Sequence, residues 1–436
     1  MKRMVVFTIW MVLFVGFLLV FARLGYKNII YDKMGYRNIF IEFVLSNGEI
    51  DPDDNREVTQ INWAEIYPKN ENDDLTEQSS VTPVTMLVGK VKKLKEKIEW
   101  YYEDGFPLYV HAVEIATTFD TLLGWDIQPT GEALILENGY CVDPEAQLDI
   151  TESVQNLEEF NHFLKNDGRE LLYVQAPFKI YSETVLPLGY IDYSNQNADA
   201  FIKELERKNI DYLDLREVFM TDESKWYELF YITDNHWKVQ TAFDATDIIC
   251  NYLSELYGCN YSKALFDLSE YQIKRYNNIY LGAYGRKFTL AKVKPEDFEF
   301  IIPKYETSFH FYMPELGIDA EGDFEELFID YDKLEVANHY TSDAYMSYRT
   351  RGYYLTQIYN KEADNKGKRV LILRDSYANP VVPFLALEYE YVDSIQPKEF
   401  DGSIASYIDE TDPDIVIVMY TTSNLENEDD GSFDFE

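Results

Sequence analysis

Asp234 and His236 stand two residues apart in the segment "LFYITDNHWKVQTAF", and Ser376 follows the apolar segment "KRVLILRD". Acyl transfer needs a hydroxyl that a base makes nucleophilic, and a carboxylate that orients the base. The three residues therefore fit a serine nucleophile, a histidine base and an aspartate that fixes the histidine tautomer. The alternative is structural, because an aspartate near a histidine is common in so acidic a chain, and Asp234 could be only the N-cap of a following helix.

The elements around these residues could bring them together. The aromatic run before Asp234 is predicted as a strand, and residues 239–258 are predicted as a helix. Ser376 is expected in a tight turn after a buried strand, with Pro380 suited to begin a helix. Because parallel strands end at the same edge of a sheet, where active sites of α/β folds gather, Ser376 and His236 are expected to meet there.

Residues 151–425 alternate between helical and strand patterns. Amphipathic helices and short apolar strands in this order favour βαβ units and a parallel sheet flanked by helices. The helices are predicted at 154–168, 197–210 and 403–410, and the strands at 170–177, 211–215 and 414–420. Residues 260–366, rich in tyrosine, acidic residues and turn signals, are expected to form an inserted mixed segment that leaves the sheet.

The N-terminus predicts contact with a membrane. Residues 4–22 carry no charge and are long enough to cross a bilayer. We expect residues 1–24 to be a signal-anchor transmembrane helix, although a cleavable signal peptide is the alternative. The expected protein is single-pass in the cell membrane, with an extracytoplasmic region at 25–150 before the α/β domain and a disordered acidic tail at 426–436.

Composition limits the possible partners. The chain has 436 residues, of which 46% are hydrophobic, which is ample for a core. Its net charge of -39 would repel phosphates, so no nucleic acid partner is expected. The 36 tyrosines offer faces for sugar rings, but they would equally fill half-buried strand positions.

Cofactor and metal signals are not found in the sequence. Neither a dinucleotide-binding nor a P-loop glycine motif occurs, and no cofactor is expected. Three cysteines without C-x-x-C spacing do not make a disulfide framework or a zinc site. Cys250 is predicted as a buried thiol, and a bridge from Cys250 to Cys259 would need the chain to turn back between them.

The order of five segments resembles the DHHW family and, more distantly, the SGNH-like (GDSL-type) hydrolases and acyltransferases of the alginate O-acetylation machinery. The segments are "LLYVQAPFK", "YLDLREVF", "YITDNHW", "YLGAYGRKFT" and "VLILRDSYANPVVPFLA". The resemblance covers residues 150–425. It implies an SGNH-like α/β fold in rearranged order, with the aspartate and histidine ahead of the serine. The catalytic roles of that group fall on Asp234, His236 and Ser376.

Two residues depart from the pattern of that group. Asn235 stands where the family name expects a histidine, and Arg374 replaces the glycine ahead of Asp375 and Ser376. Arg374 is expected either to bind an acidic or acetyl-bearing sugar group, or to mark a site that no longer catalyses.

The remaining candidates concern binding. The backbone N–H of Ser376 is expected to stabilise an oxyanion, with Asn379 and Asn424 as further candidates. Trp237 is interpreted as a packing residue, with sugar stacking as the alternative.

The expected function is acyl transfer. We expect an O-acetyltransferase or esterase that acts on a cell-surface or exported polysaccharide, with a membrane protein supplying the acyl group if it is a transferase. The alternative is a membrane-anchored glycan-binding or assembly component with a degenerate site.

Overall fold

The computed structural model describes one compact unit of the chain. Its described residues are 133–187, 189–219, 222–334, 339–340, 342–350, 355–426 and 431–435. The expected transmembrane helix at residues 1–24 lies outside these ranges. Among the helices that the structure does describe, none is long and apolar enough to cross a membrane.

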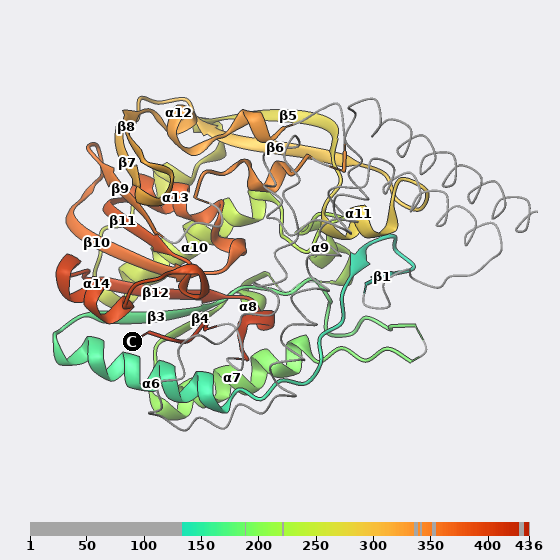
Figure 1. The fold of residues 1–436 in the computed structure, drawn as a ribbon, viewed down its shortest axis with the longest axis horizontal. Helices are drawn as coiled ribbons and strands as arrows, with labels where there is room; N and C mark the ends of the chain where they lie inside the picture. The colour runs from blue at the N-terminus through green and yellow to red at the C-terminus, as the bar shows by residue number, and fades with distance from the viewer. Residues whose placement is uncertain are drawn as a thin grey trace, which may run out of the picture. The chain divides into compact units, whose positions relative to one another are not determined.

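An eight-stranded sheet forms the centre of this unit (Figure 1). Its strand order is β4-β3-β12-β10-β11-β9-β7-β8. The first five strands in this order are parallel, namely β4 (Tyr212–Asp214), β3 (Glu170–Gln175), β12 (Ile415–Tyr420), β10 (Asn365–Arg374) and β11 (Tyr389–Ile395). The last three are antiparallel to their neighbours, namely β9 (Leu355–Asn360), β7 (Phe309–Met313) and β8 (Ile318–Gly322).

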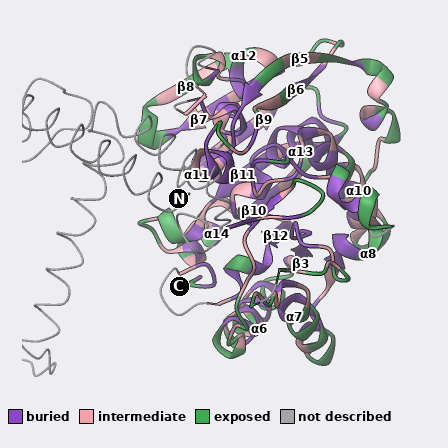
Figure 2. Ribbon diagram, turned by 90° about the vertical axis from the view of Figure 1, so that its right-hand side faces the viewer, coloured by how far each residue is buried: buried purple, intermediate pink, exposed green. Residues whose placement is uncertain are grey.

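Helices cover both faces of the sheet because successive strand residues point to opposite sides. On β12, Ile417 packs into one hydrophobic core and Val418 into the other. The first core includes residues of α10 (Val239–Tyr257) and α13 (Val381–Glu388). The second includes residues of α6 (Thr151–Asn166), α7 (Ser194–Lys208) and α14 (Ile404–Thr411). Figure 2 shows the buried sheet between helices with exposed outer faces.

The helices and strands predicted for residues 151–258 and 365–420 are largely confirmed. The segment before Asp234 is a correction, because the predicted strand is absent there. The short helix α9 (Glu223–Glu228) is followed by a loop that the isolated bridge between Phe230 and Trp237 closes. The N-cap of α10 is Lys238, so the capping alternative for Asp234 is also wrong.

The segment 260–366 does not simply leave the sheet. Its strands β7, β8 and β9 extend the sheet, which is therefore mixed rather than parallel throughout. Alternate residues of β7 are buried, and α12 (Phe324–Phe328) packs against the same core. Within the described part of this segment, β5 (Tyr271–Tyr280) and β6 (Glu296–Pro303) form a separate two-stranded sheet.

The shorter elements complete the described unit. The strands β1 (Leu134–Ile135) and β2 (Cys141–Val142) pair antiparallel, α8 (Leu215–Phe219) follows β4, and α11 (Ala283–Phe288) follows β5. All three cysteines are buried and free, so Cys250 is the buried thiol that the sequence predicts.

The C-terminal tail differs from the expectation of disorder. Phe433 and Phe435 are buried in the core beside α6, and the ring of Phe435 stacks on Phe160 at 4.1 Å between centroids. The backbone N–H of Ala405 donates to the carbonyl of Phe435. Two aromatic residues within an acidic tail are enough to dock it on the apolar face of a helix.

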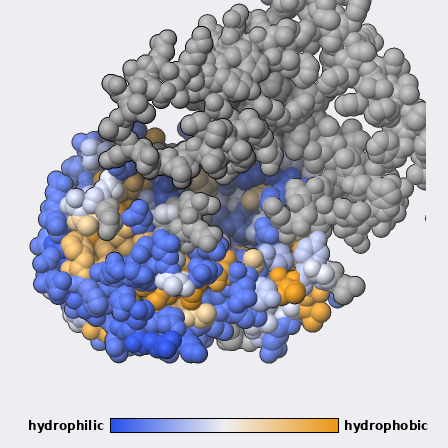
Figure 3. All heavy atoms as spheres, turned by 60° about the horizontal axis from the view of Figure 1, so that its bottom comes forward, coloured by the Kyte–Doolittle hydropathy of each residue, from blue (hydrophilic) through white to orange (hydrophobic). Residues whose placement is uncertain are grey.

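In the view of Figure 3, the described surface is mainly hydrophilic, as the net charge of -39 leads one to expect.

Candidate active site

Ser376 lies directly after the carboxyl end of β10, in a turn that is fastened to the neighbouring strand. Asp375 caps the short helix at Ser376–Ala378 by accepting from the backbone N–H of Tyr377 at 2.9 Å. Its other carboxylate oxygen accepts from the backbone N–H of Thr421 at 2.7 Å and from Asn424 Nδ2 at 2.9 Å, beyond the end of β12. The serine is therefore held at the sheet edge that the sequence predicted.

Asp234, His236 and Ser376 form a continuous chain of hydrogen bonds. His236 Nε2 lies 2.7 Å from Ser376 Oγ, and His236 Nδ1 lies 2.5 Å from Asp234 Oδ1. With the Nδ1 proton donated to the carboxylate, Nε2 is free to accept the serine proton. This arrangement can generate a serine nucleophile.

The Asp234 carboxylate is buried and held by backbone donors. Its Oδ1 accepts from the N–H of His236 at 3.0 Å, and its Oδ2 accepts from the N–H of Ala283 at 2.6 Å. Burial raises the pKa of Asp234, but the adjacent His236 and these N–H groups outweigh it, so the pKa lies well below its ordinary value. Asp234 is therefore a carboxylate ready to orient and stabilise the imidazole.

The His236 ring is fixed by an aromatic neighbour. Tyr345 stacks on the imidazole at 3.9 Å between centroids with 19° between planes, and the Tyr345 hydroxyl donates to the carbonyl of Tyr377 at 3.2 Å. Tyr377 packs against the same ring at a tilt, and its hydroxyl donates to the carbonyl of Asn235. The orientation of the base therefore depends on segments far from it in sequence.

Several residues that hold the site were not recognised as site residues from the sequence. They are Lys179, Gly282, Ala283, Glu296 and Tyr345. A signal existed for the first three, because Lys179 ends the quoted segment "LLYVQAPFK" and Gly282 and Ala283 lie in "YLGAYGRKFT". No local pattern pointed to Glu296 or Tyr345.

Arg374 does not lie where a substrate residue would have to lie. Its side chain is fully buried and donates to Ser394 Oγ at 3.1 Å, to Gln396 Oε1 at 3.2 Å and to the carbonyl of Thr350. Burial lowers its pKa to about 10, although the charge of Asp375 opposes that shift. The expectation that Arg374 binds a sugar group is therefore wrong, because the side chain faces the interior and ties β10 to β11.

Trp237 and the two asparagines are structural as well. Trp237 is fully buried and its Nε1 donates to the carbonyl of Tyr377 at 2.9 Å, which rules out sugar stacking and confirms packing. Asn379 is fully buried, and its Nδ2 points to the sulfur of Met346 at 3.8 Å. Asn424 holds Asp375 and accepts from Lys398. The Nδ2 of Asn424 is therefore engaged by Asp375.

The turn itself leaves one candidate oxyanion donor. The backbone N–H groups of Tyr377, Ala378 and Asn379 donate to Asp375 or to the carbonyl of Ser376. The N–H of Ser376 is the donor that we retain. Over the described ranges, no group of three or more histidine, cysteine, aspartate or glutamate side chains could hold a metal ion.

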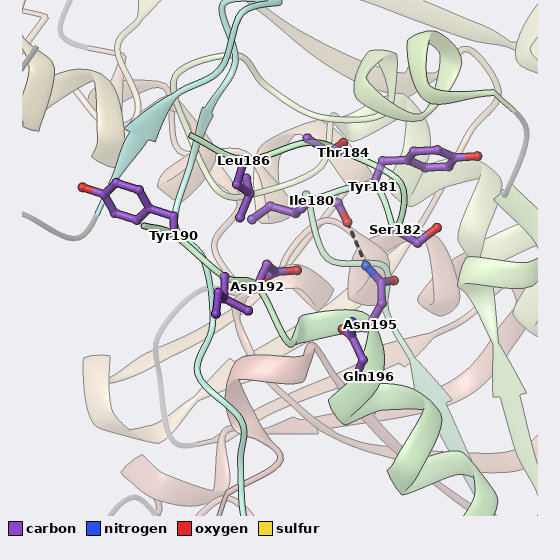
Figure 4. Close-up of a pocket in the computed structure, with 10 residues that line it drawn as sticks. Ile180, Tyr181, Ser182, Thr184, Leu186, Tyr190, Asp192, Asn195 and Gln196 are labelled. Carbon is purple, nitrogen blue, oxygen red and sulfur yellow. Dashed lines mark hydrogen bonds between the residues drawn. The ribbon is translucent and has the colours of Figure 1, made fainter. Parts of the chain in front are cut away.

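A separate hollow of about 210 Å³ lies in the segment after Lys179 (Figure 4). Asn195 donates from Nδ2 to the carbonyl of Ile180 at 3.0 Å across it. The rings of Tyr181 and Tyr190 point away from each other rather than toward a shared centre. The hollow therefore lacks paired aromatic walls and is lined by no residue of the Asp234–His236–Ser376 chain.

Comparisons with known proteins agree with this fold. Residues 134–299 match the family model described as "SGNH hydrolase-like domain, acetyltransferase AlgX". Bacillus cereus PatB1, solved with a sulfonyl adduct, superposes with a TM-score of 0.58 at 22% identity, over 70% of this chain and 98% of that one. A DHHW family protein from Eubacterium siraeum superposes with a TM-score of 0.53 at 18% identity, over 71% and 96%. No curated relative matches the sequence.

These findings confirm the resemblance that the sequence predicted. Residues 134–299 resemble an SGNH hydrolase-like domain, and the fold is shared with the two solved structures. The DHHW family protein is among its structural neighbours.

Proposed function

We propose that this chain is an SGNH-like O-acetyltransferase that acts on a polysaccharide through Asp234, His236 and Ser376. The observation that carries the proposal is the unbroken path of hydrogen bonds from Asp234 Oδ1 through the imidazole to Ser376 Oγ. The match of residues 134–299 to an acetyltransferase domain supports acetyl as the transferred group.

The chemistry follows from the order of the three side chains. His236 Nε2 takes the proton of Ser376 Oγ while the oxygen attacks the acyl carbonyl carbon, and the Ser376 N–H stabilises the resulting oxyanion. His236 then gives the proton to the leaving oxygen, which departs and leaves an acyl ester on Ser376. In the second half, His236 Nε2 takes the proton of an acceptor hydroxyl while the acceptor oxygen attacks the acyl ester, and His236 then returns the proton to Ser376 Oγ as the acyl group leaves on the acceptor.

A transferase and an esterase differ in the group that accepts the acyl group from Ser376. A transferase uses a sugar hydroxyl in this second half of the reaction, and an esterase uses water. The degenerate glycan-binding alternative rested on Arg374 ahead of the nucleophile and on the 36 tyrosines of the chain, and the burial of Arg374 bears on the first of these grounds. Because the Arg374 side chain is buried away from the solvent, that reason is gone and we favour a live site.

Localisation and the acyl donor belong to the same proposal. We propose that residues 1–24 anchor the protein in the cell membrane with the remainder extracytoplasmic, because residues 4–22 are uncharged. A site outside the membrane has no acetyl-coenzyme A, so a membrane protein would supply the acyl group. Affinity capture of the full-length protein from membranes tests for such a partner.

The first test asks whether Ser376 is a nucleophile. The full-length protein is treated with p-nitrophenyl acetate, and its intact mass is measured beside the Ser376→Ala variant and a control, Ser224→Ala, whose serine is exposed. We expect one acetyl group on the wild type and the control, and none on Ser376→Ala. Equal labelling of all three would place the nucleophile elsewhere, and no labelling of any would favour the glycan-binding alternative.

A second measurement separates the two reactions that share this site. Acetyl-labelled enzyme is offered a neutral oligosaccharide and, separately, buffer alone. Faster loss of the label with the oligosaccharide, together with an acetylated sugar product, supports the transferase. Equal rates of loss would indicate an esterase.

A further inference from the structure

The loop that carries Asp234 has no regular secondary structure, yet most of its backbone N–H and C=O groups form hydrogen bonds. Residues 231–236 lie between α9 and α10, outside any strand of the sheet. Backbone N–H and C=O groups buried away from water need partners, which helices and sheets normally provide. Here two charged side chains from distant segments, Lys179 and Glu296, provide partners for four of these groups.

Lys179 donates hydrogen bonds to backbone carbonyl groups of this loop. Its ammonium group donates to the carbonyl of Asp234 at 2.7 Å and to the carbonyl of Ile232 at 2.9 Å, while the side chain is 1% exposed. The rings of Tyr140 and Tyr284 lie 5.4 Å and 5.7 Å from the same nitrogen. Two of the three ammonium hydrogens therefore serve the loop, and the rest of the group faces aromatic rings instead of water.

Glu296 accepts hydrogen bonds from backbone N–H groups of the same loop. Its Oε2 accepts from the N–H of Ile232 at 2.8 Å, and its Oε1 accepts from both the N–H and the hydroxyl of Thr233 at 2.7 Å. The Thr233 hydroxyl in turn accepts from the N–H of Gly282 at 3.1 Å. Glu296 begins β6, so the small sheet of β5 and β6 reaches the loop through this carboxylate.

The two charges hold residues 232–234 through complementary backbone groups, Lys179 through carbonyls and Glu296 through N–H groups. Each is costly to bury alone, but each is compensated by charge-assisted hydrogen bonds to the loop, and the two lie near enough to attract each other. Hydrogen bonds to other backbone groups would satisfy this loop at a lower cost in free energy than two buried charges do. Two buried charges give it one conformation, and that conformation aims the Asp234 carboxylate at His236.

We propose that Lys179 and Glu296 are positioning residues that set the Asp234–His236 hydrogen bond by holding the backbone of residues 232–234. The inference rests on the proposed acyl transfer. It adds two residues that need touch neither the substrate nor the reacting atoms.

The variants are Lys179→Met, which keeps the length of the side chain without its charge, and Glu296→Gln, which sets an amide against two N–H donors. Lys238→Met is the matched control, because Lys238 lies near Lys179 but makes no side-chain hydrogen bond to residues 232–234.

The rate of p-nitrophenyl acetate acylation is measured in the full-length proteins, per active site titrated with a sulfonyl fluoride. We expect a fall of at least about 10-fold in kcat with little change in KM for both variants, and none for the control.

A second readout does not depend on turnover. The His236 Nδ1 proton, bonded to Asp234 at 2.5 Å, should give a far-downfield proton NMR resonance. We expect this resonance to shift or disappear in Lys179→Met and Glu296→Gln, and to return in part in Lys179→Arg, which restores the charge.

The outcomes separate the two proposals. Variants that lose thermal stability but keep the wild-type acylation rate per active site and the wild-type resonance would overturn the positioning role, leaving Lys179 and Glu296 as structural only. If the wild type is not acylated, the proposed function fails, and the NMR resonance alone then decides whether the two charges position the histidine.

Discussion

Gly282 lies against Asp234 so closely that a Cβ atom on Gly282 would fall 2.3 Å from the Asp234 Cβ and 2.7 Å from its Cα. Real Cβ atoms do not approach other atoms so closely, and the Asp234 backbone cannot swing aside as the end of a flexible side chain can. The glycine lets the backbone of Ala283 reach the Asp234 carboxylate, to which it donates at 2.6 Å. Gly282, in the segment after β5, and Asp234, before α10, thus depend on each other for their positions. The site depends on both residues.

The first prediction concerns this contact. Gly282→Ala should displace Asp234 from His236 and lower the acylation rate about 100-fold, because misplacement by about 1 Å costs that much. Gly322→Ala is the control, since the nearest atom to its new Cβ is the carboxylate end of Glu326, which can move. Acylation by p-nitrophenyl acetate checks both, and a fully active Gly282→Ala would show that the carboxylate position matters little.

Asp234→Asn should disable the base without disturbing the fold. An amide in place of the carboxylate no longer selects the tautomer with Nδ1 protonated, so kcat should fall by about 10³ or more. In the His236→Ala variant, adding Asp234→Asn should cause almost no further loss of kcat, because the two residues act as a unit. Single and double variants with additive losses would mean that Asp234 and His236 act separately.

Arg374→Met should reduce stability and spare catalysis in the protein that remains folded. Its loss leaves the buried acceptors on Ser394 and Thr350, and the half-buried one on Gln396, without this donor, which should cost about 2–4 kcal/mol in the free energy of unfolding. Urea denaturation measures this, with the exposed Arg275→Met as the control. An unchanged free energy of unfolding with a raised KM would return Arg374 to a role in substrate binding.

Glu145 makes stability depend on pH. Burial raises its pKa from 4.5 to about 8, and the nearby Asp192 and Asp143 add to the shift while the Thr422 hydroxyl opposes it. Between pH 4.5 and 8 the folded protein keeps a proton that the unfolded chain has released, so this group's contribution to stability falls as the pH rises through that window.

The Glu145→Gln variant measures that contribution. Between pH 5.5 and pH 8.5, we expect it to lose less free energy of unfolding than the wild type does, by more than about 1 kcal/mol. Urea denaturation at both pH values measures this, with Glu137→Gln, at an exposed position, as the control. The same pH response in wild type and Glu145→Gln would mean that Glu145 titrates as an ordinary carboxyl.

The sequence alone determined the alternation of helices and strands in residues 151–258 and 365–420, and the three side chains that meet at the sheet edge. Local patterns suffice there: β12 is apolar throughout, α10 has apolar residues at helical spacing, and Gly258 ends that helix with a φ of 68°. The position of Ser376 after a parallel strand was predicted correctly, whereas His236 reaches it from the loop between α9 and α10 and not from the end of a strand.

Only the tertiary structure decided what holds those side chains and what the apparent departures mean. The aromatic run before Asp234 has the composition of a strand, but Lys179 and Glu296 supply several of its backbone hydrogen bonds, and both residues come from distant segments. Arg374 lies two residues before the nucleophile in sequence, yet its side chain is fully buried and bonds to Ser394 and Gln396. Long-range partners and side-chain direction depend on packing between distant segments, and a linear pattern of residue types does not encode either.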